Sequence, residues 1–157
     1  MPDRAEDREI ERKFLLRRLP DAVRGVVPVR IEQGWLPGTV IHERVRRISG
    51  PEGVTHWRTI KLGRGIERQE FEEEATAELF AGLWALTDGR RVVKDRYRVP
   101  AGDLVWEVDA FVGRDLVLAE VELPDRDAPV PMPPWLVGDL VREVTDEPAY
   151  LNLTLAG

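Results

Sequence analysis

The segment EIERK at residues 9–13 places two carboxylates and an amine at alternate positions, Glu9, Glu11 and Lys13. Successive side chains of a β-strand point to opposite faces, so these three side chains would share one face. Adjacent like charges repel each other unless a positive charge lies between them. The segment therefore predicts a strand whose charged face meets further charges from elsewhere in the chain.

Charged residues two positions apart recur in nearly all of the remaining segments that have strand-like alternation. The acidic members of this set are Glu9, Glu11, Glu70, Glu72, Glu107, Asp109, Glu120 and Glu122. The basic members are Lys13, Arg44, Arg46, Lys61, Arg68, Lys94 and Arg96. The chain thus repeats one pattern, in which a charged face alternates with a face that is often apolar.

Glycine, proline and aspartate punctuate these segments at short intervals, which favours hairpins and antiparallel pairing. The predicted strands cover residues 8–16, 29–36, 40–48, 54–62, 66–73, 91–98, 104–112 and 115–123. A helix is predicted over 72–86, because acidic residues in a first turn favour the helix dipole. A second helix is predicted after Pro134, in PWLVGDLVREV.

Two interpretations of the charged faces remain open. Each pair could lie on the solvated face of an open sheet, where surface ion pairs contribute roughly 0–1 kcal/mol. The whole set instead favours a sheet closed into a barrel, with apolar residues outside, covered by helices, and a charged lumen. The apolar alternation of Val117, Ala119, Val121 and Leu123 on the last predicted strand supports the second interpretation.

Length and composition restrict the class of protein. A chain of 157 residues suits one domain, 1–157. The net charge of −6, from 23 basic and 29 acidic residues, does not indicate nucleic acid or an anionic membrane as a partner. Cysteine is absent, and the charged first residues lack the apolar core of a signal peptide. We expect a cytoplasmic protein, and a homodimer remains an open alternative.

A lumen lined by both signs of charge suits a metal ion together with a phosphate chain. Paired carboxylates are oxygen ligands for Mg²⁺ or Mn²⁺, while arginine and lysine bind phosphate oxygens. The charged set carries a formal charge of −1, which two divalent ions would turn to +3. A triphosphate of about −4 would then nearly balance it.

EIERKF resembles the E-x-E-x-K signature of the CYTH domain, the family of triphosphate tunnel metalloenzymes. Further blocks occur in the order and spacing of the short bacterial members of that family. They are QGWL (33–36), RVR (44–46), TIK (59–61), EFE (70–72), KDRY (94–97), WEVDAF (106–111), AEVEL (119–123), PPW (133–135) and VTDEPAYLN (144–152). The resemblance therefore covers almost the whole chain.

The resemblance implies an α+β fold that is mainly antiparallel β: a closed eight-stranded tunnel with flanking helices and a C-terminal plug helix. It implies a metal-dependent triphosphatase, with inorganic tripolyphosphate as the favoured substrate and Mg²⁺ or Mn²⁺, two ions per site, as cofactor. The implied phosphate-binding residues are Lys13, Arg44, Arg46, Lys61, Arg68, Lys94 and Arg96. The implied metal ligands are Glu9, Glu11, Glu70, Glu72, Glu107, Asp109, Glu120 and Glu122.

Glu9, Glu11 and Lys13 are the implied catalytic residues, and Lys13 could either position or deprotonate the attacking water. Alternatives are an adenylyl cyclase, an enzyme acting on thiamine triphosphate or a nucleoside triphosphate, and a polyphosphate-binding module without turnover. An organic substrate would need an aromatic platform, but tryptophan is more often used for packing. The tryptophans concerned are Trp35, Trp57 and Trp84, while His42 and His56 fit no ligand spacing.

Overall fold

The computed structural model describes residues 8–62 and 67–157, although the side chains of residues 8, 9, 67 and 68 lie outside that description. The strands are β1 (Arg8–Leu16), β2 (Val29–Trp35), β3 (His42–Gly50), β4 (Gly53–Leu62), β5 (Glu67–Glu74), β6 (Arg91–Ala101), β7 (Leu104–Phe111), β8 (Val117–Glu122) and β9 (Leu140–Glu143). The helices are α1 (Ala77–Trp84), α2 (Pro134–Val137) and α3 (Asn152–Ala156), with 3₁₀ turns η2 (Ala85–Thr87) and η3 (Pro148–Tyr150).

All strands pair antiparallel in one sheet of order β5-β4-β3-β2-β6-β7-β8-β1-β9, and β5 also pairs with β1. The predicted α+β fold, mainly antiparallel β, is confirmed. The β1–β5 contact is only three residue pairs long and lies close to residues 63–66, which are outside the described ranges. Closure of the sheet into a barrel therefore stays a prediction.

The eight predicted strands all form, with ends that differ by at most three residues. The helix predicted over 72–86 is shorter, because residues 72–74 continue β5 and α1 begins only at Ala77. Thr76 caps this helix, since its side chain accepts a hydrogen bond from the amide of Leu79 at 3.0 Å. The acidic run thus belongs to the strand and not to the first turn of the helix.

The second predicted helix, in residues 134–144, is wrong beyond its first turn. α2 ends at Val137, and Leu140–Glu143 instead form β9. β5 pairs with the first residues of β1 and β9 pairs with Phe14–Leu16, while β8 occupies the other side. β9 forms because it covers the edge of β1 that β5 leaves unpaired, and exposed strand edges are unfavourable.

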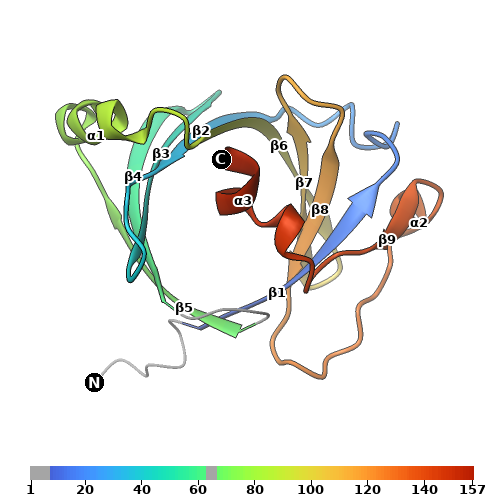
Figure 1. The fold of residues 1–157 in the computed structure, drawn as a ribbon. Coiled ribbons are helices and arrows are strands. Elements are labelled where there is room, and N and C mark those ends of the chain that lie inside the picture. The colour runs from blue at the N-terminus through green and yellow to red at the C-terminus, as the bar shows by residue number, and fades with distance from the viewer. Residues whose placement is uncertain (1–7, 63–66) are drawn as a thin grey trace.

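The sheet has an inner face, which carries Lys13, Arg44, Lys94 and Asp109, and an outer face. Figure 1 shows the strands curving around α3, which lies against β6 and β2 on the inner face, with α1 outside β3 and β4. Arg46 lies two residues after Arg44 on β3 and therefore shares its face. Gln33 of β2 lies opposite Arg46, so it is on the inner face as well.

Apolar residues form a separate cluster on each face. The outer cluster comprises Phe14, Leu16, Val23, Trp106, Val108, Ala119, Val121, Leu123 and Leu136. The inner cluster comprises Trp35, Val92, Phe111, Leu118, Val144 and Ala156. Because Val144 and Ala156 belong to the C-terminal segment, that segment is anchored to the inner face beside the charged residues. No helix in the described ranges has the length and apolar character needed to cross a membrane.

Candidate active site

Strand register brings the predicted charged residues of β1, β7 and β8 together. Glu11 and Lys13 of β1 lie opposite Glu122 and Glu120 of β8, and Glu120 lies opposite Glu107 of β7. Directly opposed residues of antiparallel strands point to the same face. Four carboxylates and one amine from three neighbouring strands therefore share one region of the inner face.

Asp109 lies between two of the predicted phosphate-binding cations. Its Oδ2 is 2.7 Å from Nζ of Lys94, and its Oδ1 accepts a hydrogen bond from Nε of Arg96 at 2.8 Å. Nη2 of Arg96 donates to Oδ2 at 2.9 Å. Both Lys94 and Asp109 are fully buried. This group of three carries a net positive charge, so Asp109 acts here as a counter-ion of the two cations.

The pKa of Lys94 is lowered to about 8, chiefly by burial; Asp109 opposes this shift, and the positive charge of Arg96 adds to it. Burial would raise the pKa of Asp109, but Arg96 and Lys94 outweigh burial and hold that pKa below its ordinary value. The carboxylate is therefore ionised at neutral pH. It stays paired with Lys94 and Arg96 in a region of the inner face that is shielded from water.

Lys13 is bound between β8 and the C-terminal segment. Its Nζ lies 3.3 Å from Oε1 of Glu120 and donates a hydrogen bond to the carbonyl oxygen of Tyr150 at 3.0 Å. Burial would raise the pKa of Glu120, but Lys13 and Arg96 hold it well below its ordinary value. Lys13 and Glu120 are both buried, so their geometry is fixed by the fold.

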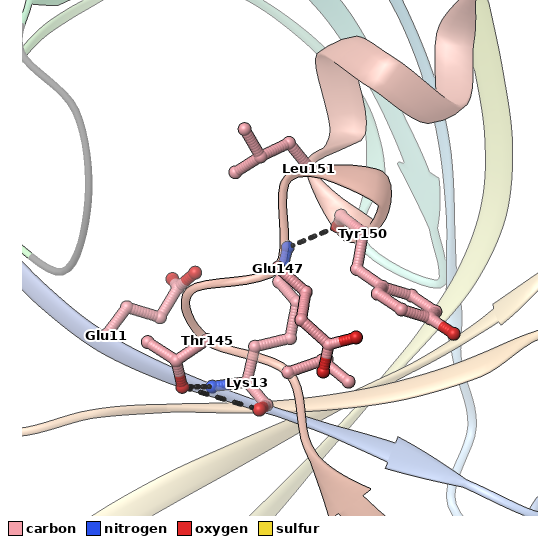
Figure 2. A pocket seen from close by; sticks show the side chains of 7 residues that line it. Glu11, Lys13, Thr145, Glu147, Tyr150 and Leu151 are labelled. Carbon is pink, nitrogen blue, oxygen red and sulfur yellow. Dashed lines mark hydrogen bonds between the residues drawn. The ribbon is translucent and has the colours of Figure 1, made fainter.

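A small pocket adjoins Lys13, and Figure 2 shows it between β1 and the C-terminal segment. Its interior is about 20 Å³, enough for about one water molecule. The hydroxyl of Thr145 fixes the segment here, since it accepts a hydrogen bond from the amide of Lys13 at 3.0 Å. The lining residues are Glu11, Lys13, Val144, Thr145, Glu147, Tyr150 and Leu151.

A second cationic group lies on β3, β4 and β5. Nη2 of Arg44 donates to the hydroxyl of Thr59 at 3.3 Å and lies 3.8 Å from Oε1 of Glu70. Nζ of Lys61 is 3.7 Å from the other oxygen of Glu70. Glu70 thus links Arg44 and Lys61, whereas Glu72 on the same strand is exposed.

Arg46 of β3 is held by an amide of β2. Its Nε and Nη2 donate to Oε1 of Gln33 at 3.0 and 2.9 Å, and Gln33 is fully buried. Burial lowers the pKa of Arg46, and so do the nearby positive charges of Arg44 and Arg96. Gln33 was not among the predicted site residues, although its position in frame with Trp35 on the inner face could have suggested it.

The C-terminal segment contributes residues that were not predicted as part of the site. Nζ of Lys94 donates to Oδ1 of Asn152 at 3.2 Å, and Asn152 opens α3. The segment that lies against the inner face is therefore 144–156, which begins at the last residue of the helix predicted in PWLVGDLVREV.

The carboxylates of β1, β7 and β8 have the donor chemistry that Mg²⁺ and Mn²⁺ require. Partial burial and the negative charges of Glu107 and Glu70 raise the pKa of Glu122. A cation near Glu122 would relieve this repulsion, so the donor set fits a divalent ion. In the described part of the chain, however, no three carboxylates or imidazoles already lie close enough together to hold one.

Two predicted site residues lie outside the described side chains. Glu9 and Arg68 have paired backbones in β1 and β5, and they lie opposite each other. Their side chains belong to the part of the chain that the structure does not describe. The predicted roles of Glu9 in metal binding and catalysis, and of Arg68 in phosphate binding, stay predictions.

The tryptophans have packing contacts. Trp35 is buried in the inner cluster, and the guanidinium of Arg44 lies 5.7 Å from its ring centre. Trp84 stacks on Phe80 of α1, outside the sheet. Trp57 is half-buried, and its indole donates to the hydroxyl of Thr55 at 3.0 Å.

The chain is similar to two curated proteins named inorganic triphosphatase. It is 41% identical to the one from Nitrosomonas europaea, in an alignment of 157 positions that covers 94% of this chain and 96% of that protein. It is 34% identical to the one from Acetivibrio thermocellus over 153 residues, which cover 94% and 92%. No protein-family model matches the chain, so the CYTH name stays a prediction.

Two solved structures are similar to this chain in fold, and one of them is an inorganic triphosphatase. A crystal structure of an inorganic triphosphatase superposes with a TM-score of 0.65 at 36% identity, covering 94% of this chain and 93% of that one. A protein from Pyrococcus horikoshii superposes with a TM-score of 0.55 at 19% identity, covering 76% and 80%. The second likeness concerns the fold alone.

Proposed function

This chain belongs to the inorganic triphosphatase family, and we propose that it hydrolyses tripolyphosphate to pyrophosphate and phosphate with a divalent metal ion. The observation that carries the proposal is the gathering of five predicted cations on one face of the sheet, next to a group of carboxylates on β1, β7 and β8. These cations are Lys13, Arg44, Arg46, Lys94 and Arg96.

We infer further that the sheet closes into a tunnel around the substrate. The pairing of β5 with β1 supports this closure, because it joins two strands that are far apart in the order of the sheet. The C-terminal segment would then close one end, since α3 lies against β6 and β2 (Figure 1). A tunnel would exclude bulk water, and electrostatic interactions with a phosphate chain are stronger where water is excluded.

The cations would bind the phosphoryl oxygens and stabilise the negative charge that develops on them during transfer. Lys94 and Arg96 are pre-positioned by Asp109, which costs no rearrangement when the substrate arrives. Nζ of Lys13 lies between Glu120 and the carbonyl of Tyr150, from where it can orient a water in the adjoining pocket (Figure 2). Positioning and charge stabilisation are the main protein contributions to such reactions.

Glu11, Glu107, Glu120 and Glu122 would hold the metal, together with Glu9. A bound divalent ion would polarise the phosphoryl oxygens and lower the pKa of a coordinated water. Glu120 already pairs with Lys13 at 3.3 Å, so the fold holds its carboxylate in place. We expect two ions, whose positive charge would offset the negative charges of both the carboxylates and the triphosphate.

The test is phosphate release from tripolyphosphate, pyrophosphate and ATP, with Mg²⁺, Mn²⁺ or a chelator, for the wild-type protein and Glu11→Gln. We expect metal-dependent release from tripolyphosphate that is lost in Glu11→Gln. Formation of cyclic AMP from ATP would instead indicate an adenylyl cyclase. Tight, metal-independent binding of tripolyphosphate without turnover would indicate a binding module, and either result would contradict the proposed hydrolase.

A further inference from the structure

Neighbouring residue pairs of β2 and β3 hold an arginine in two different ways. On the outer face, Glu32 lies opposite Arg47 and its carboxylate accepts a hydrogen bond from Nε of Arg47 at 2.7 Å. On the inner face, Gln33 lies opposite Arg46 and its amide oxygen accepts hydrogen bonds from Nε and Nη2 at 3.0 and 2.9 Å. The same strand pair thus uses a carboxylate outside and a neutral amide inside.

The amide orients Arg46 without neutralising it. An arginine side chain keeps its charge in proteins, so a neutral partner leaves a full positive charge on the inner face. Arg46 forms no ion pair with any residue in the described ranges. The other described cations of the site each have a carboxylate at 2.7–3.8 Å: Lys13, Arg44, Lys61, Lys94 and Arg96.

The side-chain N–H group of Gln33 also lacks a hydrogen-bond partner in the described ranges. Arginine can only donate hydrogen bonds, so Oε1 of Gln33 faces Arg46 and Nε2 points away from it. Nε2 is buried and has no hydrogen-bond partner among the residues that the structure describes. Burying an unpaired N–H group is unfavourable, so a glutamine that served packing alone would be a poor choice here.

We propose that Gln33 is a positioning residue for the triphosphate, which holds Arg46 as a cation without a counter-ion so that it binds a phosphoryl oxygen. This inference rests on the proposed function and adds a residue to its binding site. The positive charge of Arg46 and the unpaired N–H of Gln33 both favour an anion at this place. The other described cations of the site each have a carboxylate within 3.8 Å, whereas Arg46 has none at ion-pair distance in the described ranges.

Substitutions at residue 33 separate this role from a structural one. Gln33→Glu keeps an oxygen acceptor for Arg46 and has nearly the same size, but it neutralises the guanidinium. Gln33→Met keeps the length of the side chain and the charge of Arg46, but it removes the acceptor. Glu32→Gln is the matched control, because it makes the reverse change on the outer face of the same strand.

The experiment measures KM and kcat for tripolyphosphate with Mg²⁺, and Tm with and without tripolyphosphate, for wild type and the three variants. We expect Gln33→Glu to raise KM by roughly 10–100-fold with a smaller change in kcat, while its Tm without substrate equals or exceeds that of the wild type. Gln33→Met should raise KM several-fold, and Glu32→Gln should leave KM unchanged. A structural glutamine would not produce a higher KM together with a higher Tm.

A KM for Gln33→Glu within about twofold of the wild-type value would overturn the inference. If that variant does not fold, an unchanged KM in Gln33→Met overturns it instead. Failure of the proposed function is a separate result, because it would appear as absent turnover in the wild-type protein. In that case the rise in Tm caused by tripolyphosphate decides: an equal rise in wild type and Gln33→Glu overturns the role of Gln33.

Discussion

Asp109 and Arg96 form a two-pronged ion pair across β6 and β7, in which Nε and Nη2 of Arg96 donate to the two carboxylate oxygens at 2.8 and 2.9 Å. The exposed fraction of the Asp109 side chain is 1% and that of Arg96 is 11%. Because Lys94 shares the same carboxylate, removing the charge of Asp109 would leave two buried cations without their main counter-ion.

We therefore predict that Asp109→Asn lowers the free energy of unfolding by about 3–5 kcal/mol, as expected when one partner of a buried ion pair is lost. Urea unfolding followed by circular dichroism measures the change. The control is Asp95→Asn, which removes the partner of the half-exposed Arg30 on the outer face and should cost at most about 1 kcal/mol. Equal losses in the two variants would contradict the importance of the buried pair.

The lowered pKa of Lys94 predicts a pH dependence of stability. In the unfolded chain this amine titrates near its ordinary value of about 10.4, whereas in the folded chain its pKa is about 8. Between these values the folded state binds fewer protons than the unfolded state, so the contribution of Lys94 to stability rises with pH. Below pH 8 the amine is protonated in both states and the penalty of burying its charge is complete.

The comparison of wild type with Lys94→Met isolates this contribution, because the variant has no titrating group at residue 94. We expect the stability of the wild type relative to Lys94→Met to increase by roughly 3 kcal/mol between pH 8 and pH 10.5. Urea unfolding at intervals of half a pH unit measures the difference. A difference that stays constant over this range would show that Lys94 is not buried as a charged group.

Most of the sheet could be predicted from the sequence because its signals are local. Alternating charge on β1, β3 and β8, and glycine or proline at the turns, are visible in windows of a few residues. β9 could not be predicted, since LVRE becomes a strand only by pairing with an edge of β1 about 125 residues earlier. A segment of four residues has too little pattern of its own to compete with the helix signal of Pro134.

The charged members of the site were predicted because their sign and spacing repeat. Gln33, Thr59 and Asn152 were missed because each is a single neutral residue whose role depends on one contact with an arginine or lysine. Such contacts depend on strand register or on the docking of the C-terminal segment, and no spacing rule identifies them. The charged residues could therefore be found from the sequence alone, whereas their neutral partners could be identified only in the folded structure.

Gly34 provides a test of the packing beside Gln33. A methyl group at this position would lie 2.5 Å from Oγ1 and 2.6 Å from Cβ of Thr87, which is fully buried. We predict that Gly34→Ala lowers the free energy of unfolding by about 1–3 kcal/mol through overpacking. Gly82→Ala, in α1, meets no atom within 4 Å and should stabilise the protein by about 0.5–1 kcal/mol. Thermal unfolding of both variants distinguishes these outcomes, and a stable Gly34→Ala would contradict the packing.

Asn152 tests the contribution of the C-terminal segment to the site. We predict that Asn152→Ala raises KM for tripolyphosphate several-fold, because Lys94 loses the amide oxygen that accepts its hydrogen bond at 3.2 Å. Thr154→Ala is the control, since Thr154 is exposed on the same helix. Steady-state kinetics of the two variants provide the comparison, and an equal KM in both would mean that α3 does not act on Lys94.

Binding of the phosphate chain on the inner face is tested most directly by comparing two adjacent arginines of β3, Arg46 on the inner face and Arg47 on the outer face. Removing Arg46 leaves no buried carboxylate unpaired in the described ranges, but it takes the donors away from the amide oxygen of the buried Gln33, so activity is compared in variants whose folding is verified by circular dichroism. The measurement is kcat/KM for tripolyphosphate with Mg²⁺ in Arg46→Met and Arg47→Met. We expect a loss of about 100-fold or more in Arg46→Met and a change of less than about threefold in Arg47→Met. Wild-type activity in a folded Arg46→Met protein would contradict it, because the phosphate chain would then not bind on the inner face.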